Sequence, residues 1–460
     1  MSDILPLLLS LQPALPKTTA RQLHRIIVAM LSMTGRITQL GISRWTDQGG
    51  SYRTIQRFFH TEIDWLEVKW LFFKLFVYDP EAIYLLVGDE SVITKAGEHT
   101  FGIGRFFSSL FDKAIPGLAL FSMALVNVTK RQAYSLANEQ VIRTDEEIEQ
   151  AKKRKQQRKK GSKNKKSARK PGRPAGSKNK NKADVVLSPE LLRIQAQLNK
   201  ALKLIKTRMS VSFFVLDGHF GNHLACQMVR QSGLHLISKM RCDAALYLEP
   251  TTFQSQQSPR RKYGDRLDFA NLPAAALRSS QSEEGYETCV YQMRCLHKDF
   301  AHPLNVVVIK KTHLASGRVG HVILFSSEPF LGAETLIDYY TLRFQIEFTF
   351  RAAKQHFGLE DFMGVKKTSV ANAMSLSFFM VNLSSYLLGS FRTRFAGAGI
   401  SDLKSWYRGH HYASALLKLL PQTPDPIICD QVLEQICRLG FIHQPPQRAA
   451  ERAADLEMAA

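Results

Sequence analysis

The chain has 460 residues, 45% of them hydrophobic, which is enough apolar material for roughly three domains with cores of their own. Its six cysteines form no Cys-x-x-Cys pair and no cluster with histidine at zinc spacing, which argues against a zinc-finger protein and favours reduced thiols in the cytoplasm. The net charge of +22 indicates a polyanionic partner, either nucleic acid or an anionic membrane surface.

Residues 1–75 have the apolar periodicity of successive helices. One of these helices follows a Gly-Gly turn and places Ile55 and Phe59 on one face, with Arg53 and Arg57 on the other. A short helix with a basic outer face after a turn is typical of helix-turn-helix proteins that bind DNA. We therefore predict a helical DNA-binding domain here; an ordinary helical bundle with a polar surface is the alternative.

From residue 76 onward, apolar runs typical of buried strands appear. Residues 84–87 form such a run just before Asp89, and residues 212–216 form a second run just before Asp217. We interpret each as a buried strand with an acid at its carboxyl end. Together with further strands expected at 117–128 and 234–240, these runs predict the first part of an α/β core over residues 76–240.

A strongly basic segment, residues 145–186, interrupts this core. Within it, residues 152–182 contain 16 Lys or Arg and no Asp or Glu, and without them the net charge of the chain falls from +22 to +6. We expect a disordered loop that either binds nucleic acid or is only a solvated linker. Arg173, in Gly-Arg-Pro, resembles the centre of an AT-hook that binds the minor groove, which makes it a candidate DNA contact; a plain basic loop is the alternative.

The remainder of the chain first favours strands and then helices. Residues 241–332 contain ETCVYQMRCLHK, LNVVVIKK and HVILFSS, which predict β-strands joined by polar turns. The helical pattern that follows is divided into 333–400 and a C-terminal segment, 401–460. The most apolar stretch, 374–391, contains Asn382 and five serines, which favours a buried core helix over a membrane span. The first residues are too short an apolar run for a signal peptide, so we expect no membrane partner.

One predicted helix, GAETLIDYYTLRFQIEFTFRAAKQHFGLEDF, carries a polar stripe. Tyr340, Arg343, Glu347, Arg351 and Lys354 follow one another at spacings of 3, 4, 4 and 3, which places them on one face of a continuous helix. A carboxylate surrounded by cations suits a DNA backbone. The alternative is an ordinary surface helix in which Glu347 pairs with Arg351.

Asp89, Asp217 and Glu347 carry the catalytic hypothesis. Three convergent carboxylates repel one another unless they share divalent cations, and Mg²⁺ and Mn²⁺ prefer such oxygen ligands. Two ions about 3.5–4 Å apart can activate an attacking water or hydroxyl and stabilise the leaving oxygen of a phosphodiester. His219 is close to Asp217 in sequence, but two-metal chemistry needs no base, so we predict that it supports the acids or faces DNA.

These residues resemble the DDE transposases of bacterial insertion sequences, in particular the insertion-sequence-four group. That group carries a Tyr-x2-Arg-x3-Glu-x6-Lys pattern, which is complete here at Tyr340, Arg343, Glu347 and Lys354. GDESVITKAGEHTFG and LDGHFGN resemble its first and second Asp blocks, and ISKMRCDAALY and PRRKYGD resemble the segments that lead into an inserted β-domain. The resemblance covers roughly residues 25–395.

The resemblance implies an α/β fold: a ribonuclease H-like catalytic core with a β-rich insertion, a helical N-terminal DNA-binding domain and a helical C-terminal segment. It implies a DNA transposase of the bacterial cytoplasm and nucleoid that cuts transposon ends and joins them to target DNA. Asp89, Asp217 and Glu347 would hold two Mg²⁺ or Mn²⁺ ions, and a homodimer would hold the double-stranded DNA. The expected DNA contacts are Tyr340, Arg343, Lys354, Arg351, Lys239, Arg241, Arg53, Arg57 and Arg173.

Two other functions stay open at this point. A non-catalytic DNA-binding protein derived from a transposase would bind DNA without cutting it. A ribonuclease H-like metal nuclease would cut phosphodiester bonds but would not join the ends that it produces.

Overall fold

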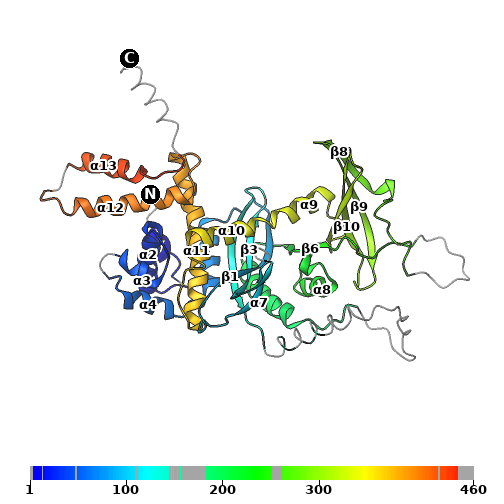
Figure 1. The fold of residues 1–460 in the computed structure, drawn as a ribbon, viewed down its shortest axis with the longest axis horizontal. Helices are drawn as coiled ribbons and strands as arrows, with labels where there is room; N and C mark the ends of the chain where they lie inside the picture. The colour runs from blue at the N-terminus through cyan, green and yellow to red at the C-terminus, as the bar shows by residue number, and fades with distance from the viewer. Residues whose placement is uncertain are drawn as a thin grey trace, which may run out of the picture.

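A computed structural model describes residues 4–443 except residues 13, 47–48, 109–111, 251–261 and 423–424 and most of 145–181, where only Glu147, Glu149, Lys153 and Gln156 are described. Figure 1 shows an elongated molecule with helices at one end, a sheet covered by helices in the middle and a β-rich lobe at the other end. Most of the predicted basic loop, including Arg173, lies outside the described residues.

The N-terminal part is helical, as the sequence predicted. Ser51 caps the fourth helix by accepting a hydrogen bond from the backbone N–H of Thr54 at 3.4 Å. In that helix Ile55 and Phe59 are buried, whereas Arg53 and Arg57 are exposed. The helices are α1 (Ile4–Leu9), α2 (Lys17–Ser32), α3 (Gln39–Arg44), α4 (Tyr52–His60) and α5 (Trp65–Phe76).

The central sheet combines antiparallel and parallel strands. Strand β3 pairs antiparallel with both β1 and β4, while β1, β5 and β6 run parallel side by side. This order is compatible with the ribonuclease H-like core that the resemblance implied. The strands are β1 (Tyr84–Thr94), β2 (Gly104–Ser108), β3 (Lys113–Asn127), β4 (Gln132–Val141), β5 (Phe213–Val215) and β6 (His235–Met240).

The expectation that Asp89 ends its strand is wrong. Strand β1 continues to Thr94, because β3 pairs with it without interruption from Tyr84 opposite Asn127 to Thr94 opposite Gly117. What ends at Gly88 is the unbroken run of buried residues, since Asp89 is only partly buried, the residue after it is exposed, and burial returns only at Ile93. The apolar run therefore marked the continuously buried part of the strand and not the extent of the strand.

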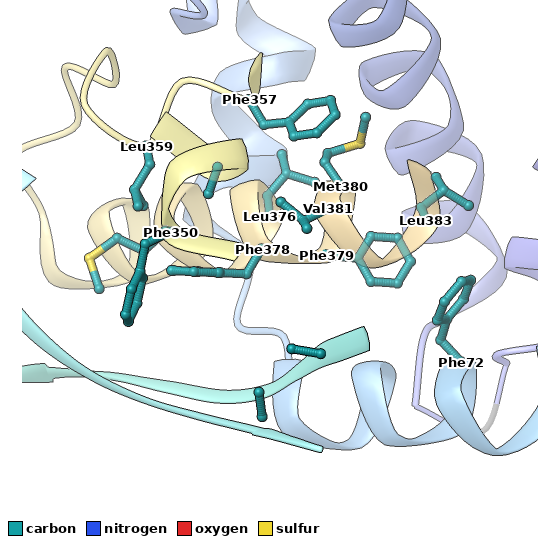
Figure 2. Close-up of a cluster of buried hydrophobic side chains, with 14 of the residues drawn as sticks. Phe72, Phe350, Phe357, Leu359, Leu376, Phe378, Phe379, Met380, Val381 and Leu383 are labelled. Carbon is teal, nitrogen blue, oxygen red and sulfur yellow. The ribbon is translucent and has the colours of Figure 1, made fainter. Parts of the chain in front are cut away.

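Helices cover both faces of this sheet, and each face has its own hydrophobic core. On one face, α10 and α11 pack together through Phe350, Phe357, Phe378 and Phe379, with Phe72 of α5 at the edge of the cluster (Figure 2). The helices of this face are α9 (Ala333–Leu342), α10 (Gln345–His356) and α11 (Lys367–Arg394). The opposite face carries α7 (Pro189–Ile205), the short 3₁₀ turn η1 (Gly218–Phe220) and α8 (His223–Gln231).

Helix α11 confirms the prediction of a buried core helix at residues 374–391. Among the described helices it alone is long and apolar enough to cross a membrane, but 78% of that apolar window is buried inside the protein. Its length and composition are therefore explained by its place in the core.

Further β-strands lie within residues 241–332. The strands continue the central sheet, because β11 pairs antiparallel with β6, so the described strands form a single eleven-stranded sheet. The elements are β7 (Leu246–Leu248), η2 (Ala274–Ala276), β8 (Leu277–Glu283), β9 (Tyr286–His297), β10 (Leu304–His313) and β11 (Val319–Ser326). A helical hairpin of α12 (Ile400–Leu417) and α13 (Pro426–Arg438) follows the core.

Lys69 of α5 is buried and pairs with no carboxylate among the described residues. Its ammonium donates a hydrogen bond to the side-chain oxygen of Asn138, which also accepts one from the Ser135 hydroxyl at 3.0 Å. Burial lowers the pKa of Lys69 from its ordinary value of 10.5 to about 7. Lys69 is therefore largely neutral in the folded protein above pH 7.

This burial predicts a pH-dependent stability. Between pH 7 and about 10 the unfolded chain binds a proton at Lys69 that the folded chain does not, so the free energy of unfolding rises with pH by up to about 1.4 kcal/mol per unit. We expect Lys69→Met to remove this rise, and Lys74→Met, at an exposed position of the same helix, to retain it. Urea unfolding at pH 7, 8 and 9 measures it; equal slopes in wild type and Lys69→Met would contradict the assignment.

Candidate active site

Strand pairing places Asp89 and Asp217 at the same level of the sheet. In the parallel pair of β1 and β5, Val87 lies opposite Val215, and each acid follows two residues later. Because side chains alternate along strands, both acids continue the face to which Val87 and Val215 belong, which is the face covered by α10.

The turn after β5 fixes Asp217. Its carboxylate caps η1 by accepting a hydrogen bond from the backbone N–H of His219 at 3.1 Å, and its carbonyl oxygen accepts one from the Ser238 hydroxyl at 2.7 Å. Gly221 lets this turn approach β6, since a Cβ atom there would lie 2.0 Å from the carbonyl oxygen of Lys239. The sequence LDGHFGN therefore contains both the acid and the glycine that its position requires.

The helix that carries Glu347 is not continuous, contrary to the prediction. Helix α9 ends at Leu342 and α10 begins at Gln345, and the junction is closed by hydrogen bonds three residues apart, such as Glu347 N–H to the Phe344 carbonyl at 3.0 Å. The tighter turn breaks the regular helical spacing, so Arg343 points into the core beside Asp89 while Arg351 stays at the surface.

Arg343 joins two of the predicted acids. Its Nη1 lies 2.7 Å from Asp89 Oδ2 and its Nη2 lies 3.2 Å from Glu347 Oε1. The Arg343 side chain is 8% exposed, the Asp89 side chain 16% and the Glu347 side chain 45%, so the pair with Asp89 is the more buried of the two. The phenol of Tyr340 hydrogen-bonds to the same guanidinium, and its pKa is raised chiefly by burial.

Asp89 is influenced by the charges of both other acids. Burial raises the pKa of Asp89 to about 6; Arg343 opposes this shift, while the charges of Asp217 and Glu347 add to it. Asp89 is therefore within electrostatic reach of both other acids. A cation placed among the three acids would lower their mutual repulsion. Among the side chains that affect the pKa of Asp89, Arg343 is the one that lowers it.

The donor chemistry of this site fits Mg²⁺ or Mn²⁺, because the three candidate ligands are all carboxylates. As they stand, no three acidic, histidine or cysteine side chains among the described residues are close enough together to hold a metal ion. Arg343 lies between Asp89 and Glu347, which accounts for their separation. The fit therefore rests on the type of ligand and on the mutual repulsion of the acids.

Lys354 lies on the same face of α10 as Glu347, seven residues or about 10.5 Å farther along the helix, and it contacts β1. Its ammonium donates to the carbonyl oxygen of Val92 at 3.0 Å and lies 3.4 Å from Glu360 Oε1. Thr94 also donates to Glu360 at 3.0 Å. Glu360 was missed in the sequence because it follows the helix in a loop, where periodicity predicts no partner; only its place in FGLEDF, next to the patterned residues, could have drawn attention to it.

The other predicted residues are spread over the molecule. Arg351 is exposed and stacks on Phe348, whereas Lys239 is exposed on β6 beside the turn that holds Asp217. Arg241 is fully exposed and pairs with Asp243 at 2.9 Å. His219 faces away from α10 and lies 3.5 Å from Glu190 of α7, which raises the histidine pKa. Arg53 and Arg57 are exposed on α4, at the end of the molecule that Figure 1 shows opposite the β-rich lobe.

Comparison with known proteins gives one family. A family model described as DDE superfamily endonuclease matches residues 10–286, which is more than half of the chain and includes Asp89 and Asp217. The match ends before α9 and α10, so it does not include Glu347 or Arg343. No match was found among curated proteins.

Proposed function

Because this chain belongs to the DDE superfamily of endonucleases, we propose that it is a DNA transposase that cuts at transposon ends and joins them to target DNA. The observation that supports this proposal is the arrangement of three carboxylates around Arg343. Asp89 and Asp217 lie level on adjacent parallel strands, and Glu347 is joined to Asp89 through one guanidinium. The Tyr-Arg-Glu-Lys spacing supports a member of the insertion-sequence-four group.

In the proposed mechanism Asp89, Asp217 and Glu347 would hold two divalent ions, Mg²⁺ or Mn²⁺. When bound, such ions activate the attacking oxygen and stabilise the leaving oxygen of a phosphodiester. Arg343 and Tyr340 lie beside the acids, where a guanidinium fork and a phenol can bind phosphate oxygens and orient the scissile group. Burial of Arg343 keeps water from competing for its donors.

We place the remaining DNA contacts on three surfaces. Helix α4 presents Arg53 and Arg57 to transposon ends, and Lys239, Arg241, Arg351 and Lys354 extend the basic surface around the acids, with His219 in a supporting position. Arg173 and the basic segment add contacts to phosphates. A homodimer would hold both ends, with α12 and α13 at its interface, in the bacterial cytoplasm and nucleoid.

An integration assay tests this function. Purified protein is mixed with a labelled fragment that carries the ends of its element, a supercoiled target plasmid, and either Mg²⁺ or EDTA. We expect end cleavage and joined products with Mg²⁺ and neither of them with EDTA. Cleavage without joining would indicate a metal nuclease, and binding without cleavage a DNA-binding protein without catalysis; either result would refute the proposal.

Glu360 offers a separable prediction. If it holds Lys354 along β1, then Glu360→Gln frees a cation next to the proposed DNA site without touching the acids. We expect DNA affinity to be unchanged or slightly higher, while the cleavage rate of bound DNA falls about tenfold, because Lys354 is less well positioned. Single-turnover cleavage and filter binding measure the two effects. Glu98 is an exposed acid in the loop that follows β1, and Glu98→Gln should change neither the DNA affinity nor the cleavage rate.

The basic segment gives a prediction about salt. Deletion of residues 152–182 removes 16 cations and is expected to weaken DNA binding and to flatten its dependence on salt concentration, because fewer counterions are released. Binding titrations at several salt concentrations measure the slope. An unchanged slope would show that the segment makes no contact with DNA.

A further inference from the structure

The C-terminal end of α10 is held by two lysines from different parts of the chain. Lys404 of α12 donates a hydrogen bond to the carbonyl oxygen of His356, the last residue of α10, at 3.0 Å. Lys95 is the first residue after β1, and it donates to the carbonyl oxygens of Glu360 and Phe362 at 2.7 Å each. Cations are favourable at the end of a helix, where carbonyl oxygens lack partners within the helix. The two lysines therefore fix where α10 and its following loop lie.

Lys95 is itself well held in this position. Its ammonium lies 3.6 Å from the centre of the Phe362 ring, which adds a cation–π contact to the two hydrogen bonds. Burial lowers the pKa of Lys95 to about 8 and the charge of Asp361 opposes this shift, so the ammonium is still charged at pH 7. Phe357 and Leu359, which follow α10, belong to the hydrophobic core (Figure 2). The loop is therefore attached both to the end of β1 and to the core.

Helix α10 follows β1 in the same direction. Arg343, just before the helix, pairs with Asp89. Farther along, Lys354 donates to the carbonyl oxygen of Val92. The strand advances about 10 Å from Asp89 to Val92, and the helix advances about 10.5 Å from Glu347 to Lys354. Because these lengths agree, contacts at the two ends of α10 define one placement of the helix along β1, and with it the position of Glu347.

The N-terminal end of α10 provides the weaker hold. It is a tight junction with α9, and its ion pair with β1 is that of Arg343 with Asp89, a proposed metal ligand. The hydrogen bonds of Lys95 go to backbone carbonyl oxygens instead. The hold of Lys95 on the loop therefore does not depend on what the three acids bind.

We propose that Lys95 is a positioning residue: by holding the loop after α10 at the end of β1, it keeps Glu347 level with Asp89. This role rests on the proposed function, because it concerns the placement of one acid of the proposed site. It differs from a DNA contact, which would change affinity, and from a purely local structural contact, which would not affect the distant Arg343.

Cleavage and binding assays separate the first two roles. Lys95→Met removes the ammonium and keeps the apolar stem. We expect single-turnover cleavage of a bound transposon end to fall about 100-fold, the effect of a displacement of about 1 Å at a reacting group, while DNA affinity stays within a few-fold. Lys95→Arg should keep most of the rate, because a guanidinium can also donate to two carbonyl oxygens. An unchanged rate, or a loss of affinity as large as the loss of rate, would refute the positioning role.

A double-mutant cycle tests the placement of α10 without metal or DNA. Lys95 follows Asp89 by six residues of β1, about 20 Å, and the effects of substitutions so far apart normally add. We expect Arg343→Met to raise the unfolding equilibrium constant about tenfold less in Lys95→Met than in wild type, because Arg343 meets Asp89 only when α10 is in place. Urea unfolding of the full chain measures the four constants, and additive effects would refute the proposal.

Controls make both results specific. Lys113 is an exposed lysine at the start of β3, so Lys113→Met should change neither cleavage nor affinity and should be additive with Arg343→Met. If Lys95→Met does not fold, Lys95→Gln, which keeps a polar group at this position, takes its place. A wild type that shows the coupling but does not cut DNA would refute the proposed function and leave the anchoring of α10 by Lys95 standing.

Discussion

Asp217→Asn and Glu347→Gln are each expected to lower the rate of metal-dependent DNA cleavage by about 10³-fold. Loss of one carboxylate weakens the binding of the metal ions, which supply several kcal/mol of transition-state stabilisation. DNA binding should remain within a few-fold of wild type, since neither substitution removes a cation. Single-turnover cleavage and filter binding with the same labelled end measure both quantities.

Asp338→Asn is the matched control for these variants. Asp338 lies on α9 and pairs with Arg131 at 2.7 Å, so the substitution also removes one carboxylate charge near the core but leaves the three acids intact. Its cleavage rate should equal that of wild type. Cleavage at the wild-type rate by Glu347→Gln would remove Glu347 from the site and would leave the two aspartates without their third partner.

Arg343→Met is expected to destabilise the metal-free protein by about 2–3 kcal/mol. Removal of one member of a buried ion pair leaves the other charge uncompensated, and the half-exposed Glu347 contributes less than Asp89 does. Mg²⁺ or Mn²⁺ should stabilise this variant more than wild type, because a metal ion can balance the negative charges of the carboxylates once the Arg343 guanidinium is absent. Urea unfolding with and without metal measures the difference.

Two comparisons make this result specific. Arg351→Met removes an exposed guanidinium from the same helix and should change neither the stability nor the response to metal. Arg343→Lys should resemble Arg343→Met, because an ammonium is a single point charge and does not span both carboxylates as the guanidinium fork does. An equal response to metal in wild type and Arg343→Met would contradict the idea that Arg343 stands among the metal ligands.

The sequence predicted much of the fold because burial leaves a direct pattern. The apolar runs before Asp89 and Asp217 are strands, and residues 374–391 lie in a buried helix. Pairing between strands leaves no such pattern. The register that sets Asp89 level with Asp217 depends on which strand lies next to β1, and β5 is brought there from more than 100 residues away in sequence. The chain order alone does not contain that information.

The polar stripe shows where periodicity fails. Regular helical spacing predicted one continuous helix with five residues from Tyr340 to Lys354 on one face, but the helix breaks between α9 and α10, and Arg351 is exposed and stacks on Phe348. The two residues at the break are Arg343 and Phe344, and neither is a proline or glycine, so the sequence contains no helix-breaking residue that would predict it. The bridge between Asp89 and Glu347 is a tertiary feature: it depends on how α10 packs on the sheet, which no local pattern reveals.

Iron-directed cleavage of the polypeptide tests most directly whether the three acids share one metal site. Fe²⁺ replaces Mg²⁺ at carboxylate sites, and with ascorbate and peroxide it cuts the backbone close to where it is bound. We expect cuts next to Asp89, Asp217 and Glu347 together, strengthened by transposon-end DNA, suppressed by excess Mg²⁺ and lost in Asp217→Asn. Cuts at other positions, or cuts near Asp89 and Asp217 without any near Glu347, would contradict it.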